Sequence, residues 1–130
     1  MRIFGSTILL HLFLSGCDKS PQWKIYHQSD YETILIDEAS IKRKDGFVSF
    51  WYSSELKSHP DVHFLWKEVY DCKKRKGMSL FYEVVKSIDT LPKNVPDLTD
   101  EDKWMDVTSN LWDSKVFSQL CEPTIKKTFF

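Results

Sequence analysis

The chain has 130 residues, with 18 basic and 19 acidic side chains and a formal net charge of −1. This balance argues against a nucleic-acid-binding protein, which usually presents a strongly basic face. The length suits a single domain, and an aromatic content of 15% supplies apolar bulk for its core.

The first element in chain order is a short apolar segment behind a single basic residue. Arg2 precedes the mostly apolar run from Ile3 to Leu14, and two small residues then lead to Cys17. This order of charge, apolar stretch and small-residue cleavage position is typical of a secretory signal. The run is too short for a membrane-spanning helix, which needs about 20 apolar residues.

The ending Leu14-Ser15-Gly16-Cys17 resembles the lipobox of bacterial lipoproteins, in which the signal is cut before a cysteine that is then acylated. We predict a signal peptide over residues 1–16, a lipidated Cys17 opening a short tether over 17–22, and one domain over 23–130. Two acyl chains anchor a protein stably, because each buried methylene contributes about 0.8 kcal/mol. The expected location is the cell envelope, at the outer membrane or surface, or at the inner membrane facing the periplasm.

Two hairpins are expected after the tether. The first joins Ile34–Lys42 to Phe47–Ser53 and turns at Asp45-Gly46, the dipeptide that most favours a tight hairpin. The second joins residues 62–72 to 78–88, where apolar and polar residues alternate as in strands with one buried face. Its turn is basic and ends in glycine, over Lys73-Lys74-Arg75-Lys76-Gly77.

The strand at residues 47–52 differs from the others, because it is apolar on both faces apart from Ser49. We expect it to be central and covered on both sides, or exposed to a partner. Phe50, Trp51 and Tyr52 are adjacent, so at least one of these rings points away from any single buried face. An open aromatic face would favour a homodimer, whereas the loop at 89–102 or an N-terminal strand could equally cover it.

A loop, a short strand and a helix are expected to complete the domain. Residues 89–102 contain two prolines and an acidic end, which is typical of a surface loop, and 104–107 fit a short strand. The spacing of the next apolar residues then fits one face of a helix. These residues are Trp112, Val116, Leu120 and Cys121. The predicted fold class is α+β, with an antiparallel sheet of five to six strands and one C-terminal helix packed on it.

Cys72 and Cys121 are the two cysteines that remain after Cys17. The compartment beyond the inner membrane is oxidising, so an even pair there indicates a disulfide. Two buried free thiols are the alternative. A zinc site is not indicated, because neither cysteine has a second ligand at short spacing.

The order of these features resembles the surface-adhesin protein E-like domain of Gram-negative bacterial lipoproteins. The resemblance runs from about Trp23 to Cys121, and it rests on the following residues: Asp37-Glu38-Ala39-Ser40-Ile41, Val48 and Trp51, Cys72, Trp104 with Val107, and the terminal amphipathic segment. It implies an antiparallel sheet with a C-terminal helix, a disulfide between Cys72 and Cys121, and no catalytic site. The named family member binds host extracellular-matrix and serum proteins from the bacterial surface.

The basic turns are the candidate ligand-binding residues. Lys42-Arg43-Lys44 and Lys73-Lys74-Arg75-Lys76 each fall at a predicted hairpin tip. If both tips lie at the same end of the sheet, they form a positive patch for lipid headgroups, lipopolysaccharide phosphates, sulfated glycans or an acidic protein segment. Such binding would weaken with salt. Alternatively, the lysines only solvate the turns and discourage edge pairing.

A metal or catalytic site is less well supported. His59, Asp61 and His63 have the alternate spacing that places three ligands on one face of a strand, but Pro60 interrupts the run. We therefore predict no metal and no cofactor. The sequence also lacks a nucleophile elbow and a glycine-rich phosphate loop, so we predict that the protein is not an enzyme.

The function expected from the sequence is that of a lipid-anchored, non-catalytic binding or adhesion domain for a macromolecule of the host matrix or the envelope. The alternative is a periplasm-facing structural or assembly lipoprotein without a host ligand. Asp18 favours the alternative, because an aspartate directly after the lipidated cysteine resembles a signal for retention at the inner membrane.

Overall fold

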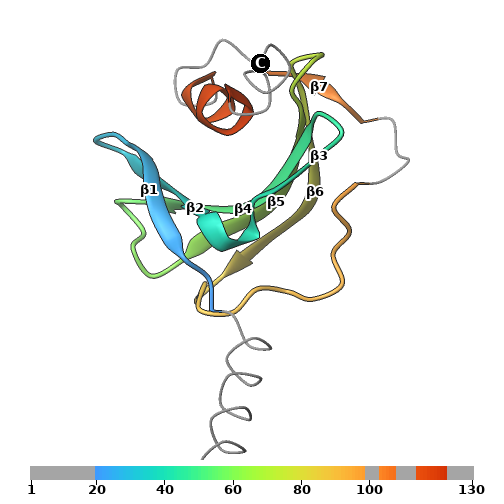
Figure 1. The fold of residues 1–130 in the computed structure, drawn as a ribbon. Helices are drawn as coiled ribbons and strands as arrows, with labels where there is room; N and C mark the ends of the chain where they lie inside the picture. The colour runs from blue at the N-terminus through green and yellow to red at the C-terminus, as the bar shows by residue number, and fades with distance from the viewer. Residues whose placement is uncertain (1–19, 99–102, 108–113, 123–130) are drawn as a thin grey trace, which may run out of the picture.

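The computed structural model describes residues 20–98, 103–107 and 114–122 (Figure 1). Within them, seven strands form one antiparallel sheet in the order β1-β2-β4-β5-β6-β7, with β3 also paired to β4. Residues 114–122 are helical and lie on the concave face of the curved sheet (Figure 1). The α+β class is confirmed. The strands are β1 (Trp23–Gln28), β2 (Glu32–Asp37), β3 (Lys42–Lys44), β4 (Phe47–Leu56), β5 (His63–Asp71), β6 (Lys76–Val85) and β7 (Met105–Asp106).

The sheet has more strands than the five to six expected, partly because the first arm of the first hairpin is interrupted. β2 and β3 both pair with β4, and the 3-10 turn η1 (Glu38–Ser40) separates them. The interruption leaves the Trp51 backbone N–H without a strand partner at this point. Ser40 Oγ accepts that N–H at 3.0 Å and donates to the Asp37 carbonyl oxygen at 2.7 Å. The buried amide is therefore satisfied by a side chain.

The first hairpin turn lies at Asp45-Gly46, as predicted. Both residues have positive φ, 54° and 85°, which is the backbone geometry of a tight turn that follows the twist of the strands.

The second turn is displaced from the predicted position. It spans residues 72–75, and Arg75 takes the left-handed conformation with φ 51°. Gly77 lies inside β6 opposite Tyr70, and a Cβ on Gly77 would approach that ring to 3.1 Å. The glycine is therefore needed for close packing against an aromatic ring and not for the turn.

β4 is central and buried on both faces. Phe50, Trp51 and Tyr52 are only 1%, 5% and 8% exposed, so these three rings do not form an open aromatic face. The neighbouring strand β5 is also buried on both faces. Residues 62–72 were expected to bury one face only, but Leu65 and Lys67 are buried on the other face of β5.

The concave face is covered by the C-terminal helix. Val116, Leu120 and Cys121 are buried there as predicted, together with Phe117. Trp112 lies outside the described residues. The Cys72–Cys121 disulfide joins the end of β5 to this helix. The hydrophobic core between the concave face and the helix comprises Ile34, Ile36, Val48, Phe50, Tyr52, Tyr70, Cys72, Val116, Phe117, Leu120 and Cys121.

The opposite face is covered by the segment after β6, which was expected to be only a surface loop. Its residues Ile88, Leu91 and Val95 pack on the sheet around Trp51 and Leu65. Ile88, predicted to end a strand, instead accepts a hydrogen bond from Trp23 Nε1 at 2.8 Å. The loop is thus a second covering layer. None of the described helical residues forms a helix long and apolar enough to cross a bilayer.

The disulfide is expected to contribute strongly to stability. It closes a loop with a sequence separation of 49, for which the chain-entropy model gives about 4 kcal/mol. We predict that the double variant Cys72→Ser, Cys121→Ser loses about this free energy of unfolding in urea titration. An unchanged unfolding midpoint would contradict this role.

Candidate functional site at the basic end of the sheet

The two basic hairpin tips lie side by side. Phe47 at the start of β4 pairs with Asp71 at the end of β5, and Cys72 N–H donates to the Gly46 carbonyl at 3.0 Å. The aliphatic part of Lys73 packs over Gly46, where a Cβ would lie 3.4 Å from Lys73 Cε. Both basic tips therefore lie at the same end of the sheet, which is the arrangement that the predicted positive patch requires.

Three of the seven predicted ligand-binding residues have structural partners. Lys42 Nζ lies 3.3 Å from Asp97 Oδ2. Arg43 Nε donates to the Leu120 carbonyl near the C-terminal end of the helix at 3.3 Å, where a positive charge favours the helix dipole. The Arg75 guanidinium lies 4.7 Å from the centre of the Phe117 ring, a distance suited to a cation–π contact.

The other four lysines form what we call the basic end, which comprises Lys44, Lys73, Lys74 and Lys76. The first three are exposed and Lys76 is half-buried. Among the described residues, none of the four has an ion-pair partner within 4.0 Å. Three carboxylates lie near them. Asp71 accepts the backbone N–H groups of Lys73 and Lys74 at 3.1 and 3.2 Å, Asp45 follows Lys44, and Asp106 pairs with Lys76 in the sheet. Because Arg43 and Arg75 lie at the same tips, six cations face these three carboxylates, and the tips carry a surplus of positive charge.

The basic end lies far from the N-terminal end of the domain. Gln22 lies beside η1, where its carbonyl accepts the Glu38 N–H at 3.0 Å. Through the pairing of β1, β2, β4 and β5, Lys24 near the start of β1 is level with Tyr82 of β6. Tyr82 lies six residues along β6 from Lys76, which is roughly 20 Å at the usual rise per strand residue. Figure 1 shows the described chain beginning at the bottom and both tips at the top.

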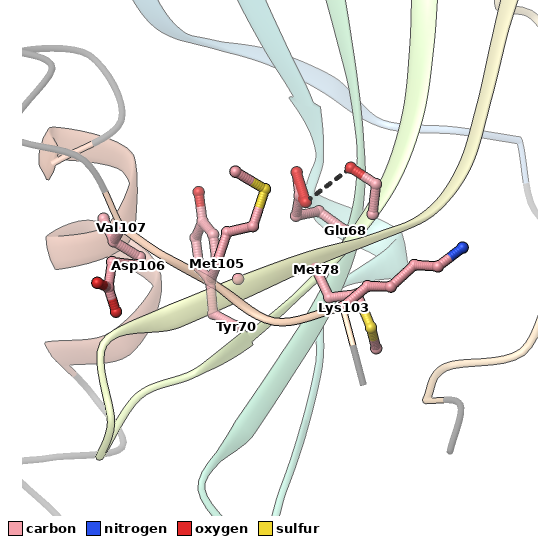
Figure 2. Close-up of a pocket in the computed structure, with 9 residues that line it drawn as sticks. Glu68, Tyr70, Met78, Lys103, Met105, Asp106 and Val107 are labelled. Carbon is pink, nitrogen blue, oxygen red and sulfur yellow. Dashed lines mark hydrogen bonds between the residues drawn. The ribbon is translucent and has the colours of Figure 1, made fainter. Parts of the chain in front are cut away.

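Hollows lined by aromatic side chains lie beside these lysines, and Phe47 lines two of the hollows. One has a volume of about 560 Å³ and is also lined by Lys42, Lys44 and Leu98. The other has a volume of about 240 Å³ and is also lined by Asp71, Lys74, Lys76 and Trp104. The centres of the Phe47 and Trp104 rings are 5.9 Å apart. A third pocket, of about 370 Å³, lies where β6 meets β7 and is lined by Met78, Met105 and Tyr70 (Figure 2).

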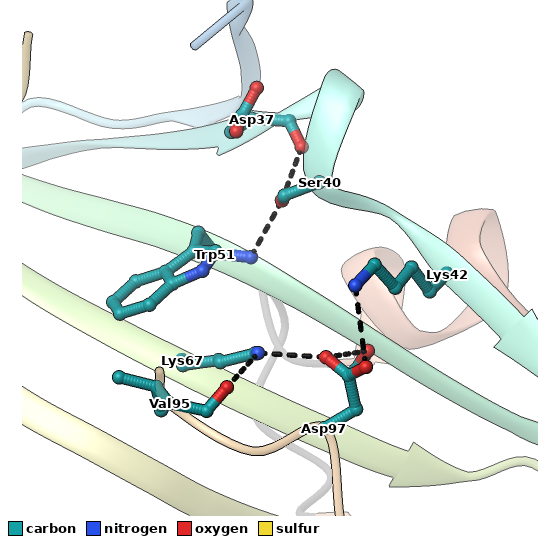
Figure 3. A network of polar contacts seen from close by, with 8 residues as sticks. Asp37, Ser40, Lys42, Trp51, Lys67, Val95 and Asp97 are labelled. Carbon is teal, nitrogen blue, oxygen red and sulfur yellow. Dashed lines mark hydrogen bonds and ion pairs between the residues drawn. The ribbon is translucent and has the colours of Figure 1, made fainter. Parts of the chain in front are cut away.

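An ion-pair network behind the basic end fastens the covering loop (Figure 3). Lys67 is 6% exposed, and its Nζ donates to Asp97 Oδ1 at 2.8 Å and to the Val95 carbonyl at 2.9 Å. The hydrogen bond from Lys67 holds the pKa of the Asp97 carboxyl below its ordinary value of 3.8, against the opposing effect of burial. Lys42 adds to the lowering. Asp97 therefore stays ionised and ties the loop to β3 and β5.

The histidine pair does not converge on one point. His63 Nδ1 lies 3.1 Å from Glu55 Oε1, whereas His59 is exposed in a turn and its Nδ1 is 2.9 Å from Ser58 Oγ. Across the described residues, no group of three His, Cys, Asp or Glu side chains is placed to hold a metal ion. Cys17 and the predicted signal peptide lie outside the described residues.

Sequence reasoning missed several residues that form this end of the domain. Lys67 was expected on a polar strand face, and Asp97 was one acid in a loop. Phe47 and Trp104 carried no signal that they meet. The one available signal was that Lys67 stands among apolar residues. In a central strand both faces are covered, so a polar residue between apolar neighbours can also be buried.

Removing each partner of the Lys67–Asp97 pair is expected to have unequal effects. Asp97→Asn leaves a buried ammonium without its carboxylate and should cost about 1 kcal/mol, a modest value because Asp97 is 47% exposed and solvent screens it. Lys67→Met should cost less, because it removes the buried charge. Equal losses in urea titration would argue against this account.

The same pair predicts a pH dependence. Because the folded pKa of Asp97 is lowered, its stabilisation is complete above the unfolded pKa near 4 and is lost as the pH falls through the folded pKa. The stability difference between the wild type and Asp97→Asn should therefore vanish in acid. A difference that persists in acid strong enough to protonate every carboxyl group would contradict the assignment.

Comparison of the chain with protein-family models, with curated proteins and with solved structures gives no match. The resemblance to the surface-adhesin protein E-like family therefore stays a prediction.

Proposed function

We propose that this protein is a lipid-anchored, non-catalytic lipoprotein of the cell envelope that binds an anionic macromolecule through its basic end. The observation that carries the proposal is the juxtaposition of the two basic tips. Four lysines from hairpins about 30 residues apart in the chain meet around Gly46 and Phe47. Charge gathered from two separate turns exceeds what solvation of either turn requires.

The orientation of the domain supports a ligand other than the membrane that holds it. A lipid on Cys17 would be joined by a tether of a few residues to the start of β1, about six residues along the strands from the lysines. The lysines then lie roughly 20 Å from the tether, whereas exposed charges are screened beyond about 8 Å at physiological ionic strength. The basic end would face away from its own bilayer, toward soluble or opposing anionic polymers.

The disulfide supports the proposed compartment. Cys72 and Cys121 are 3% and 0% exposed and form a bond within the core. Such structural disulfides belong to oxidising compartments, which agrees with export by the predicted signal. Protease shaving of intact cells distinguishes a surface adhesin from the periplasm-facing alternative, because only the former would be cleaved.

The lysines of the basic end are expected to carry the binding. Replacing Lys44, Lys73, Lys74 and Lys76 by Gln should abolish salt-sensitive retention on heparin and lower the slope of log affinity against log salt by about one unit per lost contact. The matched control replaces four exposed lysines elsewhere, Lys24, Lys57, Lys86 and Lys93. Equal retention of the two quadruple variants would rule out the basic end.

Lipidation is tested separately. Mass spectrometry of the native protein should show a chain that begins at Cys17 and carries acyl groups, and Cys17→Ser should move the protein from the membrane fraction to a soluble one. An unmodified thiol on a chain that retains residues 1–16 would contradict the anchoring, while leaving the heparin experiment on the basic end unaffected.

A further inference from the structure

The basic end contains an aromatic pair that electrostatic binding alone does not require. Phe47 opens β4, and Trp104 directly precedes β7. Their ring centres are 5.9 Å apart with planes inclined by 39°, and both side chains are half-buried. Strand β7 is held beside the lysines, because Val107 N–H donates to the Arg75 carbonyl at 3.0 Å. The fold thus brings Trp104 to the tips from a distant part of the chain.

Phe47 lines two hollows in which basic and acidic side chains stand together. The hollow of about 560 Å³ is lined by three cations and by Asp45 and Asp97, and that of about 240 Å³ by two lysines and Asp71. Asp71 Oδ1 accepts two backbone N–H groups, so its Oδ2 is the oxygen that can accept hydrogen bonds from hydroxyl groups. An acid inside a basic hollow repels a simple polyanion.

We propose that the basic end recognises a saccharide that carries sulfate or phosphate groups. This inference rests on the proposed function and specifies its ligand. The C–H face of a sugar ring stacks on an aromatic ring, its hydroxyl groups donate to a carboxylate, and its anionic substituents pair with lysines. Phe47 with Trp104, Asp71, and the lysines of the two hollows supply these three interactions within one small area.

The test compares charged ligands with and without sugar rings. The probes are a heparin tetrasaccharide, deacylated lipopolysaccharide bearing phosphates, and a short inorganic polyphosphate, each titrated at several salt concentrations. Trp104→Leu should weaken binding of the recognised saccharide by about five- to tenfold and leave the polyphosphate affinity unchanged. Trp104→Phe should retain most of the saccharide affinity, because a phenyl ring preserves the stacking face.

The control is Tyr31→Leu, which removes an 80% exposed aromatic ring outside the basic end and should change neither affinity. Asp71→Asn provides a second test that does not depend on Trp104. It should weaken saccharide binding and strengthen polyphosphate binding, because repulsion is removed. Thermal unfolding checks that each variant folds.

The outcomes separate the two proposals. Saccharide and polyphosphate affinities that respond equally to Trp104→Leu and to Asp71→Asn would overturn the saccharide inference and leave the anionic-ligand proposal standing. No binding of any probe by the wild type would overturn both. Binding of the heparin probe alone, or of the phosphorylated probe alone, identifies sulfate or phosphate as the recognised group.

Discussion

The structure depends on the burial of β4 on both of its faces. A strand that is apolar on both sides exposes a large apolar area unless two layers cover it, and a domain of this size has little chain for two layers. The protein solves this with one short helix and one irregular loop. Both covers are thin, so each needs a specific fastening: the Cys72–Cys121 disulfide on the concave side and the Lys67–Asp97 ion pair on the other.

These fastenings explain why the hairpin tips are rich in basic residues without making all of them available to a ligand. Arg43 and Arg75 hold the helix, and Lys42 helps to hold the loop through Asp97. Three of the seven basic residues predicted to bind a ligand therefore have a structural role instead. The remaining four lysines have no such task within the described residues, and their surplus charge is the physical basis of the proposed function.

The position of the basic end follows from strand pairing. In an antiparallel sheet the tips of β3–β4 and β5–β6 share one end, whereas β1 begins beside η1, level with the middle of β4. The proposed tether before β1 would thus separate anchoring from binding by about six residues along the strands, roughly 20 Å. The short β7 then adds Trp104 to the same end, which converts a charged surface into one with an apolar component.

Local chemistry in the sequence by itself determined the α+β class, the turn at Asp45-Gly46, the helical face with Val116 and Leu120, and a strand at residues 47–52 that is apolar on both faces. Each of these follows from neighbours a few residues apart. The tertiary structure alone decided that Gly77 serves packing against Tyr70, that Ser40 completes the hydrogen bonding of β4, that Asp97 pairs with Lys67, and that Trp104 meets Phe47. These contacts join segments from 7 to more than 50 residues apart, and their partners are selected by sheet register and by which loop covers which face, neither of which a local pattern encodes.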